Sequence, residues 1–254
     1  LPLNQNIILL EEWITVGGKR LSEHLEIIGH SSAIKYLEDI VKNNIELSER
    51  EIKNLHSLVT KDIKDVNSGA YRNVNVYISG SKHTSPSHIV VLKKMQQLMF
   101  WYNNESKNLH PIERAAILHG KFVTIHPFID GNGRTARLLL NFELMKNNYP
   151  PIIIKIEDRE KYFDTLEEGN MSDNWDTFTE FIKEKCEERI DYINEFKISE
   201  LKSIKWNNFK ERLQDPDEEI EEIVEDMKDD FTEHEIEIFL LETGRDNETK
   251  NKVR

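Results

Sequence analysis

The chain has 254 residues, and 47 acidic against 34 basic side chains give it a formal net charge of −13 with histidines neutral. This charge argues against a broad nucleic-acid-binding surface, which needs clustered lysine and arginine, and one cysteine excludes a disulfide framework and a cysteine-rich zinc site. Because no apolar run approaches the roughly 18 residues of a membrane span and no secretory leader follows the first leucine, we expect a processed or shortened piece of a soluble, cytoplasmic protein.

Most of the sequence has the 3.6-residue apolar period of amphipathic helices, first at residues 21–37 and again at 52–59. Ser48 and Glu51 predict a capping box before the second of these helices. Pro111 and Glu113 suit the first turn of a further helix. Glycine (10) and proline (7) are too sparse for an all-β domain, so the predicted fold class is all-α.

One segment, residues 72–91, departs from the helical period. Val74, Val76 and Ile78 alternate with polar residues, and a turn-rich stretch then separates them from a second apolar run at 89–91. This pattern predicts a short β-hairpin inserted among the helices, with a plain surface loop as the alternative.

The composition changes near residue 198. Between Asp215 and Asp230 the chain has ten acidic residues and a single lysine, yet apolar residues keep a helical stripe. We interpret this stretch as a solvated acidic helix that packs through one face, with a dedicated partner site as the alternative. The predicted organisation is a main domain over residues 1–197 and an acidic helical extension over 198–254.

Residues 126–137 contain the chemistry and read His-Pro-Phe-Ile-Asp-Gly-Asn-Gly-Arg-Thr-Ala-Arg. The glycines at 131 and 133 permit positive φ and a close approach of bare N–H groups at a helix start, which is an anion nest. Arg134 and Arg137 share a helix face and can reach an extended phosphate chain. Asp130 can hold Mg²⁺ against the same phosphates, and His126 suits a general base. The segment predicts a phosphoryl-transfer centre.

Two other chemistries are disfavoured. A P-loop nucleotidase would need a lysine followed by serine or threonine, whereas Gly17-Gly18-Lys19 is followed by Arg20. A transition-metal hydrolase built from His119, His126 and Asp130 would leave the arginines and glycines unexplained. We interpret the remaining histidines of interest as structural residues: His30, His56 and His119.

The twelve-residue segment resembles the signature of the Fic-domain family, His-Pro-Phe-x-[Asp/Glu]-Gly-Asn-Gly-Arg-x-x-Arg, without a departure. The similarity extends from about Gly17 through His30 and Arg72 to roughly Lys185, and is strongest to the subgroup that contains the metazoan endoplasmic-reticulum enzyme and bacterial relatives. It implies a helical fold with a β-hairpin flap, in agreement with the hairpin expected at 72–91.

The resemblance also implies a reaction, the transfer of AMP from ATP to a Ser, Thr or Tyr hydroxyl with release of pyrophosphate. His126 would be the catalytic base and Asp130 the Mg²⁺ ligand. The resemblance implies that the phosphates are bound by Gly131, Asn132, Gly133, Arg134 and Arg137. It implies that the flap clamps the target segment through Asn73, Val74, Asn75 and Val76. It assigns the adenine side to Tyr162, Phe163, Leu166 and Asn170.

The expected partners are ATP and a hydroxyl-bearing protein, which includes the chain itself, with neither nucleic acid nor membrane; a homodimer is left open. Three alternatives to AMP transfer remain at this stage. They are removal of AMP from a modified protein, transfer of another phosphate-containing group such as UMP or phosphocholine, and a nucleotide-sensing interaction module without catalysis.

Many members of the family have an inhibitory motif, [Ser/Thr]-x-x-x-Glu-[Gly/Asn], whose glutamate pairs with the second arginine of the signature. No complete copy occurs here, because Ser22 and Glu26 have the right spacing but Ile27 follows. We therefore expect the chain to begin just after the position of this motif and to be active without release of a brake.

Overall fold

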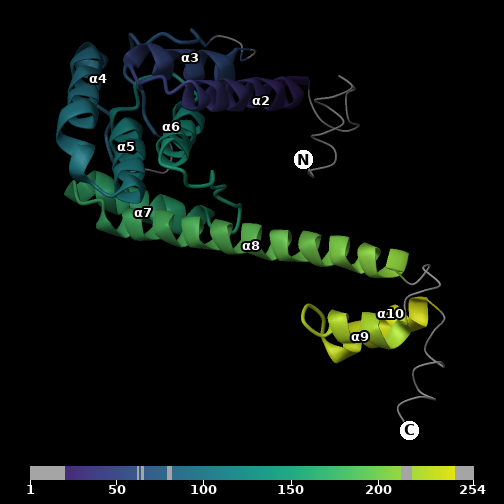
Figure 1. Ribbon diagram of the computed structural model, residues 1–254. Helices are drawn as coiled ribbons and strands as arrows, with labels where there is room; N and C mark the ends of the chain where they lie inside the picture. The colour runs from purple at the N-terminus through teal and green to yellow at the C-terminus, as the bar shows by residue number, and fades with distance from the viewer. Residues whose placement is uncertain (1–20, 62, 64–65, 79–81, 213–218, 244–254) are drawn as a thin grey trace. The chain divides into compact units, whose positions relative to one another are not determined.

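The computed structural model describes residues 21–61, 63, 66–78, 82–212 and 219–243, with side chains from residue 29 onward (Figure 1). The expected features at Gly17–Lys19 and at the start of the chain lie outside these residues. The chain divides into two units, Leu1–Arg189 and Ile190–Arg254. This division falls inside one long helix, and the boundary expected near residue 198 lies further along the same helix.

The described part of the chain is helical and none of its residues is in a β-strand, which confirms the all-α class. The helices of the first unit are α2 (Leu21–Lys42), α3 (Glu49–Thr60), α4 (Val91–Phe100), α5 (Pro111–Ile125), α6 (Asn132–Lys146), α7 (Arg159–Ser172) and the first part of α8 (Asp176–Arg212). Short irregular turns flank α4: 3₁₀ turns at His88–Val90 and Ser106–Asn108, and a π-helical turn at Trp101–Glu105. Among the described helices, none is both long and apolar enough to cross a membrane.

Helices α5 and α6 are at the centre of the first unit and pack on each other more extensively than any other pair (Figure 1). One buried cluster, around Tyr102, Phe122 and Phe142, joins helices α2 to α6. A second cluster, around Tyr162 and Phe178, joins α5 and α6 to α7 and α8. Because α5 and α6 both contribute to both clusters, the two clusters together fix the short connection between these helices. That connection is the His126–Gly131 segment.

The predicted helix starts are largely confirmed. Pro111 opens α5, where the ring of His110 accepts the Ile112 N–H at 3.3 Å. The hydroxyl of Ser48 accepts the Glu51 N–H at 3.4 Å, as a cap should. The reciprocal half of the expected capping box is wrong, because the Glu51 carboxylate is instead bound by the hydroxyl of Tyr36.

The second unit has its own small core. It contains the end of α8 together with α9 (Ile220–Met227) and α10 (Glu233–Glu242). Ile223, Met227 and Phe239 are fully buried, and the Trp206 ring packs on Phe239 at 5.2 Å between centroids. Within the acidic stretch predicted at 215–230, α9 therefore packs through one apolar face, as predicted, while residues 215–218 lie outside the described residues. A true capping box, formed by Thr232 and Glu235, opens α10.

Candidate active site

His126 ends α5 in a left-handed conformation, with φ 49° and ψ 60°. Pro127 cannot continue the helix, and a non-glycine residue at positive φ is strained unless its surroundings hold it. Arg72 provides that hold: its Nε donates to the His126 carbonyl at 2.8 Å, and its backbone N–H donates to the Pro127 carbonyl at 2.9 Å. Arg72, in the segment that precedes α4, thereby fixes the backbone of the candidate base.

The electrostatic surroundings keep His126 neutral. Burial lowers the pKa of His126 to about 4, the Val123 carbonyl raises it, and the positive charge of Arg72 lowers it further. Nδ1 is buried and makes no hydrogen bond of normal geometry, so the other ring nitrogen, Nε2, is the one available to a substrate. A neutral imidazole at physiological pH is the protonation state that a general base requires.

The loop after His126 opens α6 with glycine conformations. Gly131 has φ 77° and leaves the first turn of α6 without a side-chain cap. The Asn132 side chain both accepts from the Phe128 N–H and donates to the Phe128 carbonyl, each at 2.9 Å. Asn132 is therefore a brace of the loop, while the amides of the first helical turn have no intrahelical acceptors. An uncapped helix N-terminus of this kind favours a bound anion.

His56 supports the loop between α5 and α6 through hydrogen bonds and ring stacking. Its Nδ1 accepts the Gly69 N–H and its Nε2 donates to the Asp130 carbonyl, both at 2.9 Å. The imidazole also stacks on Phe128 with 3.6 Å between ring centroids. Burial lowers the pKa of His56 to about 4, which keeps it neutral. The expectation that His56 is structural is confirmed.

Asp130 presents a half-exposed carboxylate beside this loop. One oxygen accepts the Gly131 N–H at 2.5 Å, and the other lies 3.7 Å from a guanidinium nitrogen of Arg134. Mg²⁺ usually keeps several waters and binds through one or two carboxylates plus substrate phosphates. The single half-exposed carboxylate of Asp130 fits that mode. Among the described residues, no group of three or more His, Cys, Asp or Glu side chains is arranged to hold a metal. The transition-metal alternative, built from His119, His126 and Asp130, therefore has no cluster to support it.

The two signature arginines both lie on α6, three residues apart. The charges of both Arg137 and Arg134 lower the pKa of His30 on α2, although burial contributes most. Arg134 also donates to the Val59 carbonyl at 3.2 Å. A Cβ added to Gly133 would lie 3.5 Å from Arg137 Nη1, so the guanidinium of Arg137 lies beside the glycine loop.

The four residues expected on the adenine side all lie on α7 but differ in exposure. Phe163 is exposed and Asn170 half-buried, whereas Tyr162 and Leu166 are buried in the core shared by α5 to α8. The amide oxygen of Asn170 accepts the Thr124 hydroxyl at 2.5 Å and so ties α7 to the turn before His126.

The expected β-hairpin at 72–91 is not formed in the described residues of that segment, 72–78 and 82–91. Side chains replace a strand ladder. Arg72 Nη1 donates to the Val74 carbonyl at 2.9 Å and Nη2 donates to the Pro86 carbonyl at 2.5 Å. The Asn75 side chain accepts the His88 N–H at 2.9 Å. Asn73, Val74 and Asn75 are exposed, and Val76 is half-buried.

Two further contacts tie this segment, here called the flap, to the helices around His126. His83 Nε2 donates to the Thr124 carbonyl at 3.1 Å, and the Lys82 N–H donates to Glu167 at 2.6 Å. Neither pairing has a spacing signal in the sequence. Sequence reasoning therefore missed His83.

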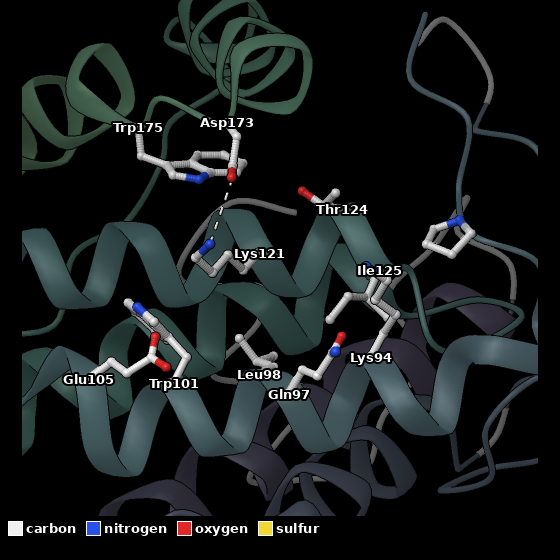
Figure 2. Close-up of a pocket in the computed structure, with 11 residues that line it drawn as sticks. Lys94, Gln97, Leu98, Trp101, Glu105, Lys121, Thr124, Ile125, Asp173 and Trp175 are labelled. Atoms are coloured by element: carbon white, nitrogen blue, oxygen red, sulfur yellow. Dashed lines mark ion pairs between the residues drawn. The ribbon is translucent and has the colours of Figure 1, made fainter.

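A pocket of about 310 Å³ lies beside the flap and is lined by α4, α5 and the turn after α7 (Figure 2). Pro86 comes from the flap, Thr124 and Ile125 directly precede His126, and Lys121 pairs with Asp173 at 3.7 Å across one wall. No residue of the 126–137 segment lines this pocket. The pocket therefore lies next to His126 but outside the signature segment.

Comparisons with known proteins agree with this geometry. Residues 46–144 match the model of the Fic/DOC family. Protein adenylyltransferase Fic of Drosophila willistoni is 39% identical over 192 residues, which is 75% of this chain and 38% of that protein. The protein of the same name from Drosophila virilis is 38% identical over 75% of this chain and 39% of its own length. The chain thus spans about two fifths of these relatives.

Solved structures give the same result. A structure of Fic-1 from C. elegans superposes with a TM-score of 0.71 at 34% identity, over 78% of this chain and 59% of that one. A Fic domain containing signaling protein from Bacteroides thetaiotaomicron superposes with a TM-score of 0.66 at 27% identity, over 73% of this chain and 76% of that one. The chain belongs to the Fic/DOC family, through the domain that contains His126 and the glycine loop.

Proposed function

We propose that this chain transfers AMP from ATP to a Ser, Thr or Tyr hydroxyl of a protein and releases pyrophosphate. The observation that supports this most directly is the juxtaposition of a neutral, half-buried histidine with an uncapped helix N-terminus. A base alone would fit many reactions. Next to an anion site with two arginines, it fits attack on a phosphorus atom.

In this proposal His126 Nε2 takes the proton of the target hydroxyl. The hydroxyl oxygen forms a bond to the α-phosphorus of ATP as the bond from that phosphorus to the bridging oxygen of the β-phosphate breaks. The electron pair leaves with pyrophosphate. The first-turn amides of α6, together with Arg134 and Arg137, stabilise the charge that builds on the leaving group.

The metal proposed here is Mg²⁺, held by the Asp130 carboxylate together with ATP phosphates. It supplies positive charge that lowers the repulsion between the phosphates and an incoming oxygen. Asp130 itself orients the loop, because it also accepts the Gly131 N–H.

For the adenine, we propose contact with Phe163 and Asn170, while the buried Tyr162 and Leu166 support α7 from within. For the protein target, we propose that the exposed edge of the flap at Asn73 to Val76 pairs with an extended segment. Such pairing uses main-chain groups and needs no particular target sequence.

The test is incubation of the chain with Mg²⁺ and ATP labelled at the α-phosphate, followed by detection of protein-bound label. We expect labelling of the chain or of added protein, and loss of at least ~10² in rate for His126→Ala with ATP affinity kept within a few-fold. His234→Ala, an exposed histidine of the second unit, is the matched control.

ATP labelled at the γ-phosphate should give no protein-bound label. If the protein is labelled by α-labelled UTP and not by α-labelled ATP, the transferred group is UMP and not AMP. Tight ATP binding without any transfer would instead favour the non-catalytic nucleotide-sensing module.

A further inference from the structure

The pocket beside the flap, here called the α4–α5 groove, has no part in the reaction steps proposed above. Its lining residues on α4 and the turn after it recur about once per helical turn, so they share one face: Lys94, Gln97, Leu98, Trp101 and Glu105. The facing wall on α5 is formed in the same way by Lys121, Thr124 and Ile125. Figure 2 shows Lys94 and Ile125 at one end of the groove and Trp101 at the other.

The groove has the length of a short extended peptide. Lys94 and Glu105 are eleven positions apart, which corresponds to roughly 16 Å at the helical rise of about 1.5 Å per residue. An extended chain rises about 3.3 Å per residue, so about five residues cover this distance. The volume of about 310 Å³ is at the low end of the roughly 300–1,000 Å³ of small-molecule pockets, so it suits one large side chain whose backbone stays at the surface.

Arg72 connects one end of the groove to the candidate base and to the exposed edge of the flap. Its guanidinium donates to three carbonyls, those of His126 at 2.8 Å, Val74 at 2.9 Å and Pro86 at 2.5 Å. Pro86 lines the groove, and Val74 belongs to the flap edge proposed to pair with the target. Because one planar guanidinium binds all three carbonyls, they lie close together. A target segment held at the flap edge with its hydroxyl at His126 therefore has the groove within reach of its neighbouring residues.

The charges that line the groove do not favour a charged occupant. They belong to two basic and two acidic residues, so they cancel: Lys94, Lys121, Glu105 and Asp173. Lys121 already pairs with Asp173 at 3.7 Å. Selection by this groove therefore depends on its apolar surface.

That apolar surface favours an aromatic ring. The indoles of Trp101 and Trp175 line the groove together with Leu98 and Ile125. Lys121 Nζ also lies 5.7 Å from the centroid of the Trp101 ring. Aromatic rings pair with one another in offset or edge-on geometry, and an ammonium attracts the face of a ring. An aromatic side chain gains from both contacts, whereas an aliphatic one gains only from burial.

We propose that the α4–α5 groove binds a large aromatic side chain of the protein target, within about five residues of the hydroxyl that receives AMP. This inference deepens the proposed function and rests on it. Main-chain pairing at the flap edge needs no particular target sequence. The groove supplies the sequence selectivity that such pairing lacks, and it does so beside the base without touching the phosphates.

The test uses synthetic peptides of about thirteen residues with one central threonine, alanine and glycine around it, and lysines only at the ends. A single phenylalanine is moved along the peptide, and AMP transfer from α-labelled ATP gives kcat and KM for each version. We expect one position within about five residues of the threonine to lower the peptide KM about tenfold relative to the all-alanine peptide, with KM for ATP unchanged. Arginine at that position should have no such effect. An equal gain from arginine would overturn the aromatic selection.

Gln97→Trp closes the groove from an exposed position on its α4 wall. It should raise the KM of the phenylalanine peptide to that of the all-alanine peptide. The matched control is Gln96→Trp, because Gln96 is the equally exposed neighbour and does not line the groove. This control should keep the tenfold difference between the two peptides. Equal effects of the two variants would overturn the proposal, and thermal unfolding checks that both are folded.

Fluorescence anisotropy of the dye-labelled peptides without ATP separates the groove from the proposed function. If the wild-type chain transfers no AMP but prefers the phenylalanine peptide, and Gln97→Trp removes that preference, the proposed function fails and the groove remains. If AMP is transferred equally to every peptide wherever the phenylalanine stands, the groove is overturned and the proposed function remains. Absence of both transfer and peptide binding would overturn the groove as well.

Discussion

Gly131 and Gly133 of the glycine loop should respond in opposite ways to the same substitution. Gly131 has φ 77°, and a Cβ added there would lie 2.6 Å from Thr60 Cγ2 and 3.3 Å from two atoms of the His56 ring. Both neighbours are fully buried, and the Thr60 hydroxyl donates to the His56 carbonyl at 2.7 Å, so neither has room to move. At Gly133 an added Cβ would meet only Arg137 Nη1, at 3.5 Å.

The expected loss of stability follows from two terms. A non-glycine residue in the left-handed region costs about 1–2 kcal/mol, and overpacking of a filled core costs about 1–3 kcal/mol. Gly131→Ala should therefore lower the free energy of unfolding by about 2–5 kcal/mol. Gly133→Ala should leave it unchanged or raise it by up to about 1 kcal/mol, because alanine is the better helix former.

Urea unfolding followed by tryptophan fluorescence measures this difference. The sequence has four tryptophans, of which Trp206 lies in the second unit. A Trp206→Phe background therefore confines the signal to Leu1–Arg189. A Gly131→Ala change below about 0.5 kcal/mol, or equal changes for the two glycines, would refute the conformational argument. The new methyl at Gly133 should weaken ATP binding without loss of stability.

Three further predictions concern activity. Because burial lowers the pKa of His126 to about 4, kcat/KM for AMP transfer should stay level from pH 8 to about pH 5 and fall as the ring gains its proton near pH 4; a midpoint near 6.5 would contradict this. Asp130→Ala should abolish both AMP transfer and the Mg²⁺ dependence of ATP binding. If calorimetry shows that ATP binding by this variant still depends on Mg²⁺, another residue holds the metal. Arg72→Lys should lower transfer about tenfold or more while ATP affinity stays within a few-fold, since lysine cannot bind three carbonyls in the same plane; equal losses in the two assays would argue for a general loss of folding.

The helices and the site loop were predictable because their signals are local. Pro111 marks a helix start whatever surrounds it, and the glycines at 131 and 133 permit the loop wherever it lies in the fold. The roles of the flap and of the adenine side came from resemblance alone. These roles stay proposals. The side chains at these positions differ in exposure, and the motif does not predict which of them are exposed.

The hairpin prediction is wrong for the described residues of 72–91, and the reason is physical. Val74, Val76 and Ile78 do alternate with polar residues, but a two-stranded ribbon without a third strand is only marginally stable. In this structure the guanidinium of Arg72 binds carbonyls on both arms and takes the place of a ladder. Alternation of apolar and polar residues indicates which residues suit a strand, but it does not indicate whether a partner strand is present.

The hydrogen bond between Tyr162 and His119 shows the second limit of sequence reasoning. The two residues are 43 positions apart and lie on two helices, so no spacing rule joins them. The sequence correctly predicts that His119 is buried on an apolar helix, and burial alone suggests a packing role. Only the distance of 3.1 Å from Nε2 to the Tyr162 hydroxyl shows that the imidazole has a polar partner. A charged histidine is costly in a buried position, and burial lowers the pKa of His119 to about 3, so the ring shares this hydrogen bond as a neutral imidazole.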